Sequence, residues 1–122
     1  MSEEFRVSPY GGRTFRLFVC DCNETPILSE AISKITYTVY RVILGTRSTV
    51  EGHENVEVAL AGHFFDEAQT STHTGEPFNF EHRISAKTKP PFPECNEKYI
   101  VIYIFFDAGG EPHPCEIVCW SE

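Results

Sequence analysis

The sequence predicts an all-β protein built as an antiparallel β-sandwich of six to seven strands. Apolar residues recur along the chain with a period of two, which is typical of half-buried strands, and not with the helical period of 3.6. Clusters of Gly, Pro, Asn and Asp, which favour turns, separate the short alternating segments. The 122 residues suffice for one hydrophobic core, so we expect a single domain over residues 1–122.

The clearest strands of the first half are predicted over residues 15–20 and 34–44. In both segments larger apolar residues alternate with smaller or polar ones, and the second is rich in the β-branched and aromatic residues that favour strands. A turn cluster at residues 23–26 lies between them, and Gly45 ends the second. We expect residues 1–13, which precede the first strand, to form a flexible or edge-pairing N-terminal arm.

The middle of the chain alternates less regularly. A brief edge strand is expected over residues 46–52, and a further strand over 56–60. Residues 61–69 carry apolar side chains at helical spacing and predict one helical turn or a loop. The Thr-, Ser- and Gly-rich segment 70–77 predicts a surface loop, after which alternation returns in a strand over 78–84.

The last third of the chain predicts two strands joined by a hairpin. Residues 87–94 contain three prolines, which cannot donate to a β-ladder, so this segment is expected to be a rigid connection. The strand over 99–106 is apolar on both faces, as in a strand that is covered twice or that meets another subunit. Residues 107–111 supply the hairpin turn, and 113–120 return as the last strand.

This succession of short strands and turns is typical of a β-sandwich with immunoglobulin-like connections. Antibody domains also have a Cys…Trp…Cys spacing with the tryptophan in a central strand. That spacing is absent here, because the single tryptophan, Trp120, lies in the last predicted strand. The pattern therefore predicts the architecture and not membership of the antibody family.

The charge of the chain excludes two classes of partner. The formal net charge is −8, from 10 Lys and Arg against 18 Asp and Glu, and it repels phosphate backbones and anionic lipid surfaces. We therefore expect neither nucleic acid nor a membrane as a partner. No basic and then apolar leader opens the sequence, and no run approaches the roughly 18 apolar residues of a membrane span. A cytoplasmic location on synthesis is expected.

The cysteines predict neither a disulfide framework nor a strong metal site. They number five, an odd count, and are expected to be reduced and mostly small buried hydrophobic residues. The weak metal candidates are Cys20, Cys22 and His63. On one strand the first two would lie about 6.6 Å apart and could share an ion only at a bend. There is no CxxC or HxxxH spacing, so we expect no bound metal or other cofactor.

No catalytic motif is present, and an enzyme is not expected. The sequence lacks GxSxG, GxxxxGK, HExxH and GxGxxG. The best local group is His63, Asp66 and Glu67, because one helical turn would place the first and last of them on one side. A metal-binding or small hydrolytic protein that uses these three residues is therefore kept as an alternative.

Aromatic residues favour a binding module over an enzyme. The interface candidates are Tyr40, Tyr99, Tyr103, Phe105 and Trp120, since aromatic side chains anchor protein contacts. A surplus apolar face on the strand over 99–106 would be available to a protein partner or to a second copy of the chain. A small-ligand or carbohydrate-binding β-sandwich is the alternative, because the same rings could stack on sugars.

The order of segments also carries a resemblance. "ISKITYTVYRV", "TVEGHENVEVAL", "FNFEHRISA", "PPFPECNEKYIVIYIFF" and "DAGGEPHPCEIVCW" together resemble small immunoglobulin- or fibronectin-like proteins of bacteriophage and prophage genomes. The likeness covers residues 15–120 and rests on pattern, so no site residue is transferred. It implies a structural or adhesive role, and a location in the virion.

Overall fold

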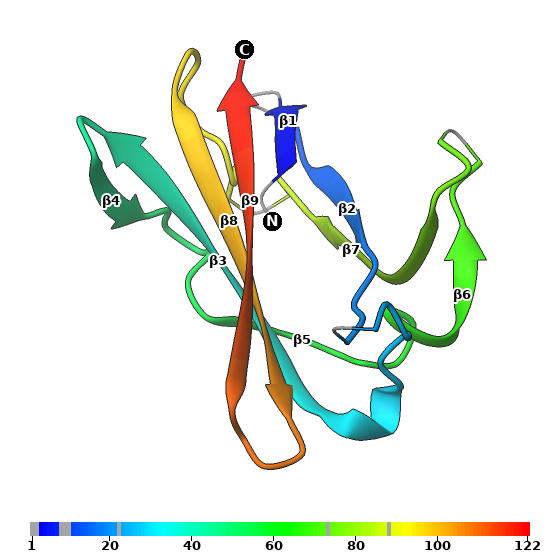
Figure 1. Cartoon of the computed structure of the whole chain (residues 1–122). Coiled ribbons are helices and arrows are strands. Elements are labelled where there is room, and N and C mark those ends of the chain that lie inside the picture. The colour runs from blue at the N-terminus through cyan, green and yellow to red at the C-terminus, as the bar shows by residue number, and fades with distance from the viewer. Residues whose placement is uncertain (1–2, 8–10, 22, 73, 88) are drawn as a thin grey trace.

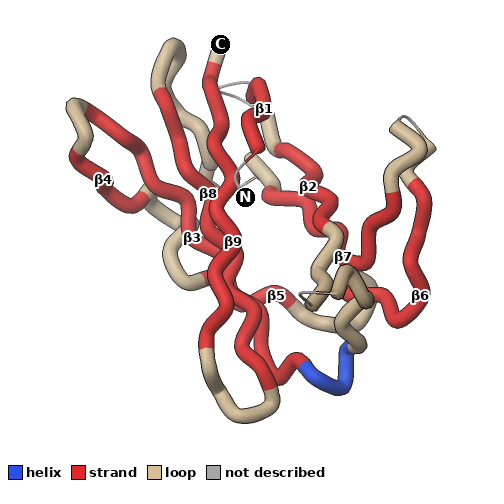
Figure 2. Tube along the Cα trace, in the orientation of Figure 1, coloured by secondary structure: helices blue, strands red, loops and turns tan. Residues whose placement is uncertain are grey.

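The computed structural model describes residues 3–7, 11–21, 23–72, 74–87 and 89–122. Within them the chain forms nine β-strands and one short 3-10 helix, arranged in two sheets (Figures 1 and 2). The all-β prediction is confirmed. The expected six to seven strands were too few, because β1 forms within the expected N-terminal arm and β6 forms where a helical turn or loop was expected.

The larger sheet has six strands in the order β1-β9-β8-β3-β4, with β5 paired to a different part of β3. All its pairs are antiparallel except β1 and β9, which run parallel. Part of the N-terminal arm thus pairs with the last strand at the sheet edge (Figure 1). The strands are β1 (Glu3–Val7), β3 (Ile32–Ile43), β4 (Thr46–Thr49), β5 (Val56–Val58), β8 (Lys98–Asp107) and β9 (Pro112–Ser121).

The smaller sheet has three antiparallel strands in the order β2-β7-β6. They are β2 (Arg13–Leu17), β6 (Phe64–Thr70) and β7 (Pro77–Ile84). The 3-10 helix η1 (Ser29–Ala31) leads from the loop after β2 into β3. Among the described residues no helix is long and apolar enough to cross a membrane.

The core lies between the inner faces of the two sheets. Phe80 of the smaller sheet contacts Tyr103 and Phe105 of the larger one, with ring centroids 5.1 Å apart in both pairs. Phe15 of β2 also packs on Tyr103, and it is completely buried. Such edge-to-face aromatic pairs add to the free energy gained from burying apolar surface. The rings of both sheets therefore interdigitate as in a β-sandwich.

The expectation of a helical turn or loop over residues 61–69 is wrong for most of that segment. The N–H groups of His63 and Phe64 both donate to the Leu60 carbonyl, at 3.1 and 2.8 Å, and this single turn ends where β6 begins. In β6 only Phe64 is buried, whereas residues 66–70 are exposed. A strand with one buried residue has no alternation that could distinguish it from a turn.

The proline-rich connection is a packed part of the core. Phe92 is completely buried against Tyr99 at the start of β8, with ring centroids 5.4 Å apart. The backbone N–H of Glu94 donates to the Tyr99 hydroxyl over 2.9 Å. This hydrogen bond joins the connection to the second residue of β8, the strand that follows it.

Candidate functional site

The outer face of the larger sheet is apolar along its central strand. Alternate residues of β8 point to opposite faces, and Tyr103 and Phe105 of one set lie in the core. The other set, with Ile102, Ile104 and Phe106, therefore points away from the smaller sheet, and these three side chains are half-buried. Both faces of β8 are apolar for different reasons: one forms the core and the other forms a surface.

Neighbouring strands extend this surface. Cross-strand pairing places Tyr40 and Val118 on either side of β8, and places Trp120 two strands from Val42. Trp120 is 42% exposed and Leu44 is 100% exposed. Leu44 lies in the two-residue turn between β3 and β4, and this hairpin projects from the sheet (Figure 1). We call the following eight residues the apolar outer face: Tyr40, Val42, Leu44, Ile102, Ile104, Phe106, Val118 and Trp120.

The charges beside the apolar outer face nearly cancel. The ammonium groups of Lys34 and Lys98 lie 5.7 and 5.8 Å from the ring centres of Phe106 and Trp120. Such contacts of a cation with a ring face are favourable and keep the lysine stems on the apolar surface. The outer side of this sheet carries four cations and three anions among the described side chains: Arg6, Lys34, Arg47, Lys98, Glu57, Glu116 and Glu122.

The five predicted interface residues divide between core and surface. Tyr99 and Tyr103 are 0% exposed and Phe105 is 3% exposed, so these three belong to the core. Tyr40 is half-buried and Trp120 is exposed, and both lie on the outer face of the larger sheet. Only the last two are available for contact with another molecule in this structure.

Two histidines lie within hydrogen-bonding distance of tyrosine hydroxyl groups in the core. His53 is buried, with its Nδ1 2.8 Å from the Tyr37 hydroxyl and its Nε2 2.8 Å from the carbonyl oxygen of Lys89. Nδ1 of His82 lies 2.9 Å from the Tyr103 hydroxyl. Burial, with a smaller contribution from the nearby His63, lowers the pKa of His82 to about 4. Burial raises the pKa of Tyr103, so both groups of this pair are neutral near pH 7.

The structure does not bring His63, Asp66 and Glu67 together as the helical turn would have. His63 Nδ1 lies 2.8 Å from the Ala59 carbonyl, within the turn before β6. Asp66 accepts a hydrogen bond of 2.7 Å from the backbone N–H of Ser29, which lowers the pKa of this carboxyl. Because residues 66 and 67 are neighbours in a strand, their side chains point to opposite faces of β6.

The cysteine candidates for a metal site are not gathered either. Cys20 is exposed and pairs as an isolated bridge with Pro26, while Cys22 lies outside the described residues. Cys119 is buried, and its burial raises the pKa of the thiol to about 12. A thiol with such a pKa remains protonated near neutral pH and is a poor nucleophile and metal ligand.

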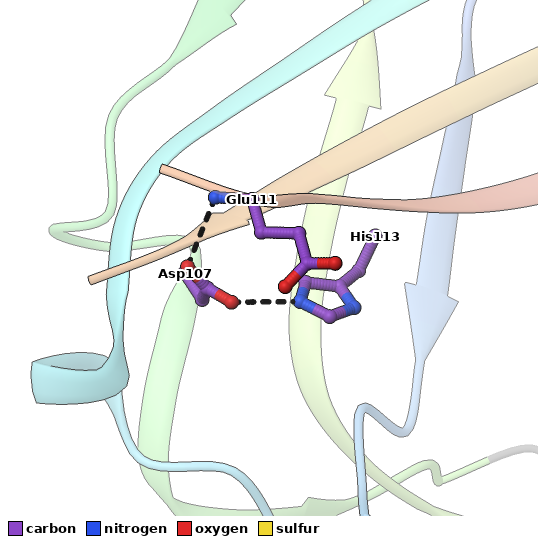
Figure 3. Close-up of side chains that lie close together, drawn as sticks. All are labelled: Asp107, Glu111 and His113. Atoms are coloured by element: carbon purple, nitrogen blue, oxygen red, sulfur yellow. Dashed lines mark hydrogen bonds and ion pairs between the residues drawn. The ribbon is translucent and has the colours of Figure 1, made fainter. Parts of the chain in front are cut away.

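One group with metal-ligating side chains occurs in the β8–β9 hairpin. Ligand atoms of Asp107, Glu111 and His113 lie within 4.8 Å of one another, the one such group among the described residues (Figure 3). Asp107 already accepts hydrogen bonds from the backbone N–H groups of Gly109 and Glu111, and its other oxygen lies 3.0 Å from His113 Nε2. These contacts explain why the three side chains lie close together: Asp107 closes the hairpin turn through its hydrogen bonds.

A cavity of about 610 Å³ lies on the smaller sheet, between β2, β7 and the loop that joins β6 to β7. Three arginine side chains line it: Arg13, Arg16 and Arg83. No local sequence pattern indicates this cavity, because two of these arginines are about seventy positions from the third. The exposed hairpin tip at Leu44 was not predicted either, because Leu-Gly is not one of the residue pairs that indicate a two-residue turn.

Comparison with protein-family models, with curated proteins and with solved structures gave no match.

Proposed function

We propose that this chain is a non-enzymatic protein-interaction module that associates with a second copy of itself through the apolar outer face. The observation that carries this proposal is the row of apolar side chains on the outer side of the sheet, flanked by exposed Trp120 and Leu44. Contiguous apolar surface of this kind marks interaction sites. Aromatic residues such as Trp120 are also the usual anchors of protein contacts.

The charge distribution favours a second copy as the occupant. The chain as a whole carries −8, so two copies repel each other through most of their surfaces. The apolar outer face is flanked by four cations and three anions among the described side chains, and it therefore escapes most of that repulsion. The Arg47–Glu116 ion pair, at 3.1 Å, joins β4 to β9 across the outer side of β3 and β8, so both signs lie on the face itself. A two-fold contact could pair each sign with its opposite.

Strand order supports the finer proposal of an immunoglobulin-like topology. In that fold one sheet contains strands G, F, C and C′ and the other contains B, E and D. The orders β9-β8-β3-β4 and β2-β7-β6 fit these two series. The hydrogen bond between Tyr99 at the start of β8 and Glu94 also fits the tyrosine corner at the start of strand F.

Association with a phage or prophage particle is proposed from the resemblance of the segment order alone. Self-association would suit such a role, because virion proteins act in repeated copies. Detection of the protein by mass spectrometry in purified particles would test it.

Light scattering after size-exclusion chromatography, over a range of protein concentrations, tests self-association. The measured molar mass of the wild type is expected to rise from that of one chain, 13.9 kDa, towards twice that value as the protein concentration increases. Trp120→Glu is expected to weaken the association at least about tenfold, because it removes an aromatic anchor and adds a negative charge. Leu28→Glu is the matched control, since Leu28 is 44% exposed and precedes η1, outside the strands that form the apolar outer face.

The outcomes separate the possibilities. A wild type that keeps the mass of one chain at every concentration overturns self-association. An equal loss in the two variants would mean that added negative charge, and not the apolar outer face, governs the association.

A further inference from the structure

We infer that the arginine-lined cavity on the smaller sheet binds a small anionic ligand through the oxygens of a carboxylate or phosphate group. The inference is independent of the proposed self-association, because the cavity lies on the opposite sheet. It rests on three observations. Arg83 lacks a described ion-pair partner, Arg16 is oriented by its neighbours, and the charge of the cavity is opposite in sign to that of the whole chain.

Arg83 has no carboxylate partner among the side chains that the structure describes. Its Nη1 is 3.5 Å from the Thr14 hydroxyl, and it forms no ion pair with any residue that the structure describes. A guanidinium has five N–H donors in a planar fork that fits two oxygens of one oxyanion. In the part of the chain that the structure describes, glutamates pair with four other arginines: Arg6, Arg16, Arg41 and Arg47.

The absence of an acidic partner at Arg83 is unusual for this composition. Acidic residues outnumber basic ones by 18 to 10, so carboxylates are abundant on the surface. Among the described residues that line the cavity, only Glu76 is acidic, against three arginines, of which Arg16 is paired with Glu81. The local charge is therefore opposite in sign to the net charge of −8, which attracts an anion to this place and not to the remaining surface.

Arg16 is held in position beside the cavity. Its Nε donates to Glu81 over 2.5 Å, and its guanidinium lies 5.4 Å from the ring centre of Phe78. The pair with Glu81 engages one edge of the guanidinium, and the Phe78 contact restrains its plane. A guanidinium that is already oriented loses less entropy when it binds an anion.

The close approach of two chain segments shapes one wall. A Cβ atom on Gly12 would lie 2.4 Å from the carbonyl oxygen of Ile84 and 3.3 Å from Nη2 of Arg83. Only glycine allows the chain before β2 to pass so near to the end of β7. Hydroxyl groups on Thr14 and Thr74 line the same space and add hydrogen-bonding groups for a polar ligand. The volume is in the range of small-molecule sites.

Isothermal titration calorimetry with three anionic probes tests the inference. Inorganic phosphate, citrate and glucuronate distinguish a phosphate ligand from a carboxylate ligand and from an acidic sugar, and glucose is the neutral control. We expect saturable binding of at least one anion below about 10 mM. Arg83→Ala is expected to weaken it about tenfold or more, because a bidentate charged hydrogen bond is lost.

Two further variants control for charge and for folding. Arg47→Ala removes the same charge from the other sheet and should leave the affinity within about twofold. Arg83→Lys keeps the positive charge but loses the planar pair of N–H donors, so it should give an intermediate affinity. It replaces Arg83→Ala as the test if that variant does not fold. The inference is overturned if no anion binds the wild type saturably, or if Arg47→Ala and Arg83→Ala lose affinity equally.

Discussion

The hydroxyl of Tyr103 on β8 lies 2.9 Å from Nδ1 of His82 on β7, so one hydrogen bond joins the two sheets through their shared core. His82 also faces Tyr37 of β3 and His63 of the turn before β6, with ring centroids 5.2 Å away in each case. A proton on His82 would introduce a charge into this aromatic environment. Keeping this charge away from water costs desolvation energy.

The free energy of unfolding should therefore decrease as the pH falls. The pKa of His82 is about 4 in the folded chain and about 6.5 when unfolded, so the unfolded state binds more protons between these values. The stabilisation is complete above pH 6.5 and is lost progressively towards pH 4. After allowance for partial exposure we expect a loss of about 1–2 kcal/mol. Urea denaturation at several pH values measures it.

His82→Phe isolates this contribution. Carboxylates also titrate in acid, so the quantity to compare is the change in unfolding free energy between pH 6.5 and pH 4 in the variant and in the wild type. The variant should lose less stability over this interval, although it is less stable at pH 7. His113→Asn, at an exposed histidine, serves as control. Parallel pH curves for His82→Phe and the wild type would contradict the assignment.

Tyr99→Phe should lower the free energy of unfolding by about 1 kcal/mol at constant pH. The substitution keeps the ring against Phe92 but removes the hydroxyl that accepts the hydrogen bond of Glu94, and so loosens the connection before β8. Chemical denaturation gives the value. Tyr40→Phe removes a hydroxyl from the half-buried outer face, where we expect a change below about 0.5 kcal/mol. Equal effects would contradict a special role for the Tyr99 hydroxyl.

The sequence predicted the position of most strands because burial leaves a period of two. It predicted β3, β7, β8 and β9 to within a few residues, since each of them places alternate side chains in the core. It failed for β6, where Phe64 alone is buried. The parallel pairing of β1 depends on long-range contact with β9 and leaves no local signal.

The candidate site was less predictable for a related reason. Both faces of β8 are apolar, so alternation could not tell which set of residues is the core. The rings of Tyr103 and Phe105 are buried because Phe80 of the opposite sheet packs against them. Ile102 and Ile104, which alternate with these residues along β8, then lie on the outer surface. Such a choice between two apolar faces requires the position of the second sheet, which a local pattern does not contain.

Gly12→Ala should destabilise the chain by about 1–3 kcal/mol. The new methyl group would lie 2.4 Å from the Ile84 carbonyl oxygen, so the segment before β2 has to move away from β7. Gly109→Ala is the matched control, because its methyl group would meet only the Asp107 carboxylate, at 3.4 Å. Thermal or chemical unfolding compares them. Equal stability of the two variants would mean that the wall of the arginine-lined cavity is looser than described.

Leu44→Asn should raise stability and weaken self-association at the same time. Leu44 has φ 50° and Gly45 has φ 80°, and a two-residue hairpin turn with two positive φ angles favours Asn-Gly. A leucine there is both conformationally unfavourable and fully exposed, which is expected of a side chain retained for contact with a partner. We expect a gain of about 0.5–1 kcal/mol by urea denaturation.

The association of Leu44→Asn, measured by light scattering, should be several-fold weaker than that of the wild type. Leu28→Asn removes a comparable apolar group from outside the hairpin and should change neither quantity in this way, because Leu28 precedes η1 and has ordinary extended backbone angles. A loss of stability in Leu44→Asn would contradict the turn argument. A gain of stability with unchanged association would mean that Leu44 is not part of the contact. The contact would then be restricted to the strands around Trp120.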